Sequence, residues 1–262
     1  MGILNLTPDS FYDGGRFRDE PAILERVGKM LEEGAAIIDI GGISTRPGAR
    51  DVSQEEELER LLPALAGIIR TYPDALISVD TFRSRVARQC LDAGAHIIND
   101  ISGGKFDEDM LPLIAETGAP YIMMHILGTP RDMQRNPQYG NVVREVKQFF
   151  EDQLDKLQKL GIQDNVVVDP GFGFGKTTEH NFQLLGNLSE FSTLNAPVMA
   201  GVSRKSMINR VLEIHPSEAL NGTTVINTIA LLNGADILRV HDVRPAVEAV
   251  TLVQYLKATT QA

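Results

Sequence analysis

The sequence predicts a single (β/α)8 barrel domain that spans residues 1–262. The chain has 262 residues, close to the ~250 that are typical of such barrels. Short apolar runs of strand length alternate with helical patterns eight times along it. A repeat of about 33 residues over eight units leaves little room for a second domain.

The strands are expected at eight short runs of apolar and β-branched residues. The runs cover residues 3–6, 36–40, 76–79, 96–99, 121–124, 166–168, 198–201 and 237–240. Continuous apolar runs of this kind are typical of parallel strands that are buried on both faces.

The helices are expected between these runs. Apolar residues recur at helical spacing over 23–31, 58–69 and 143–157. Further helices are expected over 83–92, 108–116, 180–188, 216–233 and 244–256. Five glycines stand just before a strand, where the residue after a helix must take a positive φ: Gly34, Gly94, Gly118, Gly161 and Gly234. Alternation alone does not show whether the sheet closes, so an open doubly wound sheet is the alternative.

The composition excludes several classes of partner. Lys and Arg total 25 against 35 Asp and Glu, a net charge of −10, which argues against nucleic acid or an anionic membrane as the main partner. The only cysteine, Cys90, cannot form an internal disulfide and excludes a multi-cysteine metal site. The first residues do not have the pattern of a signal peptide, and no apolar run is long enough for a membrane span, so we expect a cytoplasmic protein.

Polar residues gather after the predicted strands, whereas the segments that enter the strands are short and rich in Gly and Ala. Active sites of barrels form where the strands end, which marks one functional face. The segments after the last two strands carry Arg204, Lys205, Arg239 and His241, and this part of a barrel commonly binds phosphate. The alternative is that Arg204 and Arg239 only pair with surface carboxylates.

A second polar set consists of Asp80, Asn99 and Asp169, at the ends of the third, fourth and sixth strands. Carboxylates accept two donors and an amide offers both kinds of partner, which suits a flat heterocycle with N–H and C=O groups. The alternative for each residue alone is a helix cap.

Other motifs do not support a different site. Residues 171–177 resemble a phosphate-binding Walker loop, but Pro170 stands where its first glycine is required. The five histidines lack the spacing of a zinc site. Lys205 could instead be a Schiff-base lysine, as in barrel aldolases, so a carbon–carbon lyase is an alternative.

Taken in order, these segments resemble the dihydropteroate synthase family of pterin-binding enzymes. The matching stretches are residues 1–11 with 13–15, 40–49, 78–81, 98–103, 124–125 with 128–130, 169–176, 201–206 and 239–241. The resemblance implies a (β/α)8 barrel that joins 6-hydroxymethyl-7,8-dihydropterin diphosphate to p-aminobenzoate in folate synthesis, releasing pyrophosphate. It also implies Mg2+ as cofactor and a homodimer.

The resemblance assigns a role to individual residues, with the catalytic ones at Asp80, Asp169, Lys205, Arg239 and His241. The pterin would be held by Asp80, Asn99, Asp169 and Lys205. The diphosphate would be held by Arg46, Arg239, His241 and Asn5, with Asn5 as the ligand of Mg2+. The p-aminobenzoate pocket would contain Thr45, Pro47, Phe174 and Ser206, and Asp13 would help to close the site.

Two positions depart from the family pattern, Ile43 in place of Glu and Leu127 in place of Gln. Two alternatives remain within the same fold. One is a pterin-binding methyltransferase barrel, which should lack the loops at 44–46 and 203–206. The other is a non-catalytic paralogue that binds pterin.

Overall fold

Strands and helices alternate along the chain in the computed structural model, which describes residues 1–6, 20–44 and 50–260. The strands are β1 (Gly2–Asn5), β2 (Ile37–Gly41), β3 (Leu76–Asp80), β4 (Ile97–Asp100), β5 (Tyr121–Met124), β6 (Val166–Asp169), β7 (Met199–Ala200) and β8 (Ile237–Leu238). The α-helices are α2 (Glu20–Glu32), α3 (Gln54–Thr71), α4 (Ser84–Asp92), α5 (Met110–Thr117), α6 (Val142–Lys159), α7 (Thr178–Gly186), α8 (Ser206–Leu212), α9 (Leu220–Leu232) and α10 (Val243–Thr260). Two 3-10 helices, η1 (Leu188–Leu194) and η2 (Pro216–Glu218), complete the described elements.

The strands form a closed parallel barrel, which excludes the open sheet. Strands β1 to β6 pair in chain order and β7 pairs with β8. Backbone bridges join Val168 to Val198 and Gly2 to Val240, so β6 meets β7 and the end of β8 meets β1. The N–H of Ile3 donates to the Val240 carbonyl at 2.9 Å, which fixes that last seam. The predicted (β/α)8 barrel is therefore confirmed.

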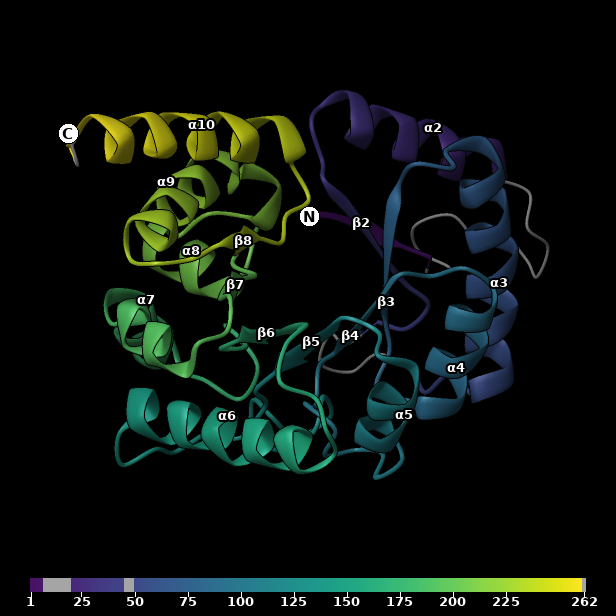
Figure 1. Ribbon diagram of the computed structural model, residues 1–262. Coiled ribbons are helices and arrows are strands. Elements are labelled where there is room, and N and C mark those ends of the chain that lie inside the picture. The colour runs from purple at the N-terminus through teal and green to yellow at the C-terminus, as the bar shows by residue number, and fades with distance from the viewer. Residues whose placement is uncertain (7–19, 45–49, 261–262) are drawn as a thin grey trace.

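The helices surround the strands, with α2 and α10 opposite α6 (Figure 1). Side chains alternate along each strand, and in β2 this sends Ile38 and Ile40 into the apolar layer beneath the helices. Asp39, between them, belongs to the other face, inside the barrel, and is completely buried. The main core thus lies between strands and helices, whereas the barrel interior carries polar groups.

The glycines expected to end helices do so. Gly34, Gly94, Gly118, Gly161 and Gly234 all have positive φ, between +65° and +103°. Each allows the chain to turn directly from a helix into the next strand.

Some boundaries differ from those expected from the sequence. The single helix over 216–233 is divided into η2 and α9, because the Arg204 guanidinium takes the carbonyls of Pro216 and Ser217. The last two strands are shorter than expected because the N–H groups of Asp236 and Ile237 both donate to the Val198 carbonyl, which makes the ladder irregular. The helices expected from the sequence do not include α8, and they include only the first residue of η1.

Among the described residues, no helix has both the length and the apolar character needed to cross a membrane.

Candidate functional site

Charged groups from five strands meet at the carboxyl end of the barrel. Asp39 lies on β2, Asp80 ends β3, Asn99 lies on β4 and Asp169 ends β6, while Arg239 directly follows β8. The first three and Arg239 are joined by hydrogen bonds although they are up to 200 positions apart in sequence. The sequence-predicted residues Asp80, Asn99, Asp169 and Arg239 are therefore brought to one end of the fold.

Arg239 connects two carboxylates across the barrel. Its Nε donates to Asp39 Oδ2 at 2.7 Å, and its Nη2 donates to Asp80 Oδ2 at 2.7 Å. The amide of Asn99 donates to the same Asp39 oxygen at 3.1 Å. The second Asp39 oxygen, Oδ1, is buried without a hydrogen-bond partner among the described residues. Two donors thus converge on one oxygen of a carboxylate that water does not reach.

The pKa of the Asp80 carboxyl lies close to neutral pH. Burial raises its pKa to about 7, while the Arg239 guanidinium acts in the opposite direction. A carboxyl with such a pKa exchanges readily between a form that donates a hydrogen bond and one that only accepts.

Asp169 and Lys205 both approach Gly201, which has no side chain to separate them. A Cβ at Gly201 would lie 3.6 Å from Asp169 Oδ2, and 3.9 Å from both Lys205 Nζ and Arg239 Cβ. Asp169 Oδ1 already accepts the N–H of Gly171 at 2.8 Å. Burial raises the pKa of Asp169, with the Lys205 charge opposing that shift. Oδ2 is therefore the oxygen that faces Gly201 and Lys205.

Lys205 is held over the loop that follows β6. Its ammonium donates to the Phe172 carbonyl and lies 4.6 Å from the centre of the Phe174 ring. Burial lowers the pKa of Lys205 to about 8, and Asp169 limits this fall. Phe174 is half-buried and packs on a small apolar cluster that includes Ile101 and Met124. The predicted residues Lys205 and Phe174 are therefore in direct contact.

His241 and Ser206 lie at the rim of the same face. The N–H of His241 donates to Ser203 Oγ at 3.2 Å, and its ring Nδ1 lies 3.1 Å from that oxygen. Its carbonyl accepts from the Arg26 guanidinium at 2.7 Å. Ser206 is exposed and opens α8, directly after Lys205.

Arg204 does not join the site, which corrects its place in the expected phosphate-binding set. Its guanidinium makes two hydrogen bonds to Asp242, at 2.8 and 3.0 Å, and also binds the carbonyls of Pro216 and Ser217. Its Nε, Nη1 and Nη2 all donate to groups that fix the chain between α8 and α9. Of the two arginines for which carboxylate pairing was the alternative, Arg204 fits that description.

Asn5 carries an amide oxygen, a type of ligand that Mg2+ accepts. It ends β1 at the carboxyl face and pairs in register with Gly41, which in turn pairs with Asp80 on β3. Over the described ranges, no group of three or more acidic, His or Cys side chains could hold a metal ion alone. Mg2+ commonly takes one or two protein oxygens and fills its other positions with phosphate and water, so a single amide oxygen fits it.

Four predicted residues fall outside the described part of the chain: Asp13, Thr45, Arg46 and Pro47.

Asp39 is the residue that the sequence reasoning missed. We searched the ends of strands, and Asp39 lies within β2, two positions before its end. The signal was a carboxylate in the apolar run Ile37-Ile-Asp-Ile40, where a charge is costly to bury without a partner.

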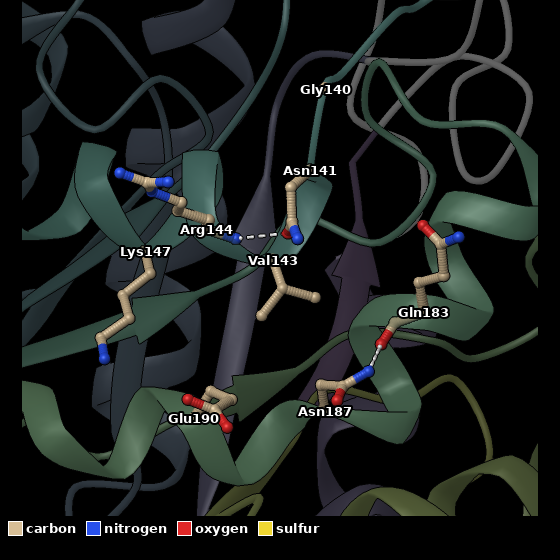
Figure 2. A pocket seen from close by; sticks show the side chains of 8 residues that line it. All are labelled: Gly140, Asn141, Val143, Arg144, Lys147, Gln183, Asn187 and Glu190. Carbon is tan, nitrogen blue, oxygen red and sulfur yellow. Dashed lines mark hydrogen bonds between the residues drawn. The ribbon is translucent and has the colours of Figure 1, made fainter.

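A separate cavity of about 490 Å3 lies outside the barrel, between α6, α7 and η1 (Figure 2). It is lined by Gly140, Asn141, Val143, Arg144, Lys147, Gln183, Asn187 and Glu190. None of these is a strand-end residue and none is buried, so this cavity is not the site where the charged groups converge.

Comparison with known proteins places the chain in one family. A family model described as "Pterin binding enzyme" matches residues 1–241. Dihydropteroate synthase of Escherichia coli K12 is 46% identical over 255 residues, which cover 97% of this chain and 90% of that protein. The Synechocystis sp. enzyme of the same name is 47% identical over 245 residues, covering 93% of this chain and 84% of the relative.

Solved structures agree. Yersinia pestis dihydropteroate synthase with a sulfonamide drug superposes with a TM-score of 0.91 at 41% identity, covering 98% of this chain and 93% of that chain. The Xanthomonas albilineans enzyme in complex with 7,8-dihydropteroate gives a TM-score of 0.87 at 36% identity, covering 98% and 92%. With a family match over most of its length and relatives of this similarity, the chain belongs to the dihydropteroate synthase family of pterin-binding enzymes.

Proposed function

We propose that the chain joins 6-hydroxymethyl-7,8-dihydropterin diphosphate to p-aminobenzoate, giving 7,8-dihydropteroate and pyrophosphate. The observation that carries this proposal is the buried set of Asp80, Asn99, Asp169 and Lys205 at the mouth of the barrel. It offers charged acceptors, an amide and an ammonium within one water-poor space, which matches a flat heterocycle rich in N–H and C=O groups. Xanthomonas albilineans relatives have been solved with 4-aminobenzoic acid and with 7,8-dihydropteroate, which supports both the amine and the product.

In this proposal the pterin lies beside Gly201, which has no side chain. Asp169 Oδ2 accepts N–H groups of the ring, and Lys205 donates to its carbonyl or ring nitrogen. Asn99 and Asp80 bind the opposite edge, and the Asp80 pKa of about 7 lets its carboxyl donate or accept as the ring requires. These contacts orient the exocyclic CH2 group, whose bond to the diphosphate oxygen breaks in the reaction.

The diphosphate is placed at the rim near Asn5, Arg239 and His241, with Arg46 added from the segment outside the described residues. Arg239 uses Nε and Nη2 for Asp39 and Asp80, and Nη1 makes no hydrogen bond to any described residue. That nitrogen is the one we assign to a phosphate oxygen. Bound Mg2+, with Asn5 among its ligands, would supply neutralisation of the leaving diphosphate.

The amine is placed between Phe174 and Ser206, with Thr45 and Pro47 completing its pocket, and Asp13 helps to close the site. The new C–N bond forms as the C–O bond breaks, the electron pair leaves with pyrophosphate, and the amine then loses one proton. Developing positive charge at the CH2 group is tolerated because Asp39, Asp80 and Asp169 lie nearby. A strong general base is not needed, since an aromatic amine attacks through its neutral form.

The test is pyrophosphate release by the purified chain with the pterin diphosphate and Mg2+, with and without p-aminobenzoate. We expect release that depends on the amine. Pterin binding without any product would instead support the non-catalytic paralogue. Lys205→Ala should weaken pterin binding, whereas a borohydride-reducible adduct at Lys205 would indicate the aldolase chemistry.

We further propose that the chain is a cytoplasmic homodimer in which a second copy covers α9 and α10. These helices pack side by side (Figure 1). Their outer surface exposes large apolar side chains: Val225, Ile229, Leu232, Leu252, Tyr255 and Leu256. Exposed large apolar side chains on two helices that pack together are typical of a protein–protein interface. The cytoplasmic assignment is supported by Cys90, which is a buried free thiol.

A further inference from the structure

Lys176 is a buried lysine that the proposed reaction does not use. It follows the glycine-rich loop after β6, and only 2% of its surface is exposed. Burying an ammonium is costly unless all of its donors are satisfied. Burial lowers the pKa of Lys176 well below its ordinary value, and no carboxylate lies within salt-bridge distance of it among the described residues. A lysine buried without a carboxylate adds little to stability, which points to another role for it.

The Lys176 ammonium has three donors and three neutral acceptors. Nζ lies 3.0 Å from the Phe174 carbonyl, 3.0 Å from His125 Nδ1 and 3.4 Å from the His125 carbonyl. When Lys176 is charged it can only donate, and His125 then accepts at Nδ1 and carries its own proton on Nε2. Burial lowers the pKa of His125 to about 2, with the Lys176 charge adding to the shift, which agrees with a neutral ring.

The loop from Gly171 to Gly175 has every carbonyl occupied. The Gly171 carbonyl accepts from the Phe174 N–H, and that of Phe172 from Lys205 Nζ. The carbonyls of Gly173, Phe174 and Gly175 accept in turn from three side chains: Gln134, Lys176 and Tyr139. The loop is thus fixed by two lysines, with Lys205 on the site-facing side and Lys176 on the buried side.

We propose that Lys176 is a positioning residue for the amine pocket, because it fixes the Phe174 peptide and so holds the Phe174 ring beneath Lys205. This inference rests on the proposed function, which places p-aminobenzoate against Phe174. Without Lys176, the Phe174 carbonyl loses the one donor that it has among the described residues, and the peptide that carries it is less constrained. The ring then leaves its place 4.6 Å from Lys205 Nζ, while Asp169 and Asn99, on β6 and β4, keep theirs. Lys176 therefore acts on the amine more than on the pterin.

The test compares Lys176→Met with Lys159→Met, which removes an exposed lysine at the end of α6. Displacement of a positioning group by about 1 Å can cost up to about 100-fold, so we expect the KM for p-aminobenzoate to rise at least about tenfold in Lys176→Met. The KM for the pterin diphosphate should stay within about twofold, and Lys159→Met should match the parent chain. A fall in kcat that follows the folded fraction, with both KM values unchanged, would show a purely structural role and overturn the proposal.

A double-mutant cycle with Phe174→Leu shows whether Lys176 acts through the ring. If it does, Lys176→Met should raise the amine KM by less than about twofold once Phe174 has been replaced, because coupled effects do not add. Independent, multiplying effects would refute the assignment. If Lys176→Met gives no cooperative melting transition, Lys176→Gln takes its place, since it keeps one amide donor. In that variant too, the KM for p-aminobenzoate should rise while the KM for the pterin diphosphate stays constant, although the rise should be smaller.

Fluorine NMR tests the positioning role without any catalytic reaction, and so tests it independently of the proposed function. With 4-fluorophenylalanine incorporated at position 174, Lys176→Met should shift or broaden the fluorine resonance, and Lys159→Met should not. An unchanged resonance would contradict the positioning role even in an active enzyme. An inactive parent chain with a Lys176-dependent resonance would instead contradict only the proposed reaction.

Discussion

Arg239 illustrates how individual residues serve the fold and the site together. It neutralises Asp39, which is completely buried and has no other cation within salt-bridge distance among the described residues. It also binds Asp80, the carboxyl whose pKa burial raises to about 7. The pair thus presents a defined arrangement of charge to the substrate and costs no rearrangement when it binds.

Removal of the guanidinium should destabilise the chain strongly. In Arg239→Met, Asp39 becomes an uncompensated buried charge, and breaking such a pair typically costs about 3–5 kcal/mol. Urea denaturation should show a loss of that order in the free energy of unfolding. The double variant Arg239→Met with Asp39→Asn should recover at least about 1 kcal/mol of it, because the stranded charge is gone. If the double variant is no more stable than the single one, the ion pair is not what Arg239 contributes.

His125 should make stability fall in mild acid. Its pKa is lowered to about 2 in the folded chain but is about 6.5 when unfolded, so below pH 6.5 the unfolded state binds the extra proton. The free energy of unfolding should therefore decrease, from this residue alone, by about 1.4 kcal/mol per pH unit below 6.5. His125→Asn keeps an acceptor for Lys176 but cannot titrate. The difference between parent and variant, measured by urea denaturation from pH 7 to 5, should follow that slope, and a constant difference would refute it.

At the scale of elements, the loop after β6 depends on glycine at a contact that the sequence does not reveal. Gly171 has φ +70°, and a Cβ there would lie 2.0 Å from the His125 carbonyl oxygen. Gly118 has a similar φ of +65° but nothing within 4 Å of its Cβ position. The two glycines therefore separate the cost of backbone conformation from the cost of close approach.

Alanine at the two positions should give very different results. Gly118→Ala should lower the free energy of unfolding by about 1–2 kcal/mol, the cost of a left-handed alanine. Gly171→Ala should lose about 1–3 kcal/mol more from the overlap with His125, and also raise the KM for p-aminobenzoate because the loop carries Phe174. Thermal denaturation and steady-state kinetics measure both effects. Equal losses in the free energy of unfolding at the two positions would show that the structure removes the overlap with His125 at no energetic cost.

Local features of the sequence predicted which segments are strands and which are helices. They did not predict where some of these elements end, or the buried hydrogen bonds of Asp39. The apolar runs and the five glycines before strands are local features, and the structure confirms them. The break between η2 and α9 depends on Arg204, a residue 12 positions away from Pro216, so no periodicity within 216–233 could show it. Asp39 was missed for the same kind of reason, since its partners Asn99 and Arg239 come from β4 and from the end of β8.

For the whole molecule, closure of the barrel decides which residues meet. Alternation of strands and helices is compatible with an open sheet, and only the seam between Gly2 and Val240 joins the first strand to the last. That seam brings Arg239 to Asp39 across 200 positions. It also brings Lys205, Arg239 and His241 to one mouth, which is how the proposed reaction would attract a diphosphate to a chain of net charge −10.

The assembly proposed for α9 and α10 has a direct test. Leu252→Glu places a charge on the exposed apolar surface of α10, where the leucine is 71% exposed. A buried, unpaired charge opposes association, so analytical ultracentrifugation should show a shift from dimer to monomer. Leu76→Glu, which makes the same change at another exposed leucine far from α10 in the sequence, should leave the dimer intact. A parent chain that sediments as a monomer would refute the proposed homodimer.

The most direct test of the account is the formation of 7,8-dihydropteroate by the parent chain and by Asp169→Asn, with both substrates and Mg2+. The parent should form one dihydropteroate for each pyrophosphate released. Asp169→Asn replaces the carboxylate whose Oδ2 faces Gly201 and Lys205, and should reduce kcat/KM for the pterin diphosphate at least about 100-fold, or about 2.7 kcal/mol, while the protein stays folded. Absence of dihydropteroate with the parent chain, or equal rates for the two proteins, would contradict it.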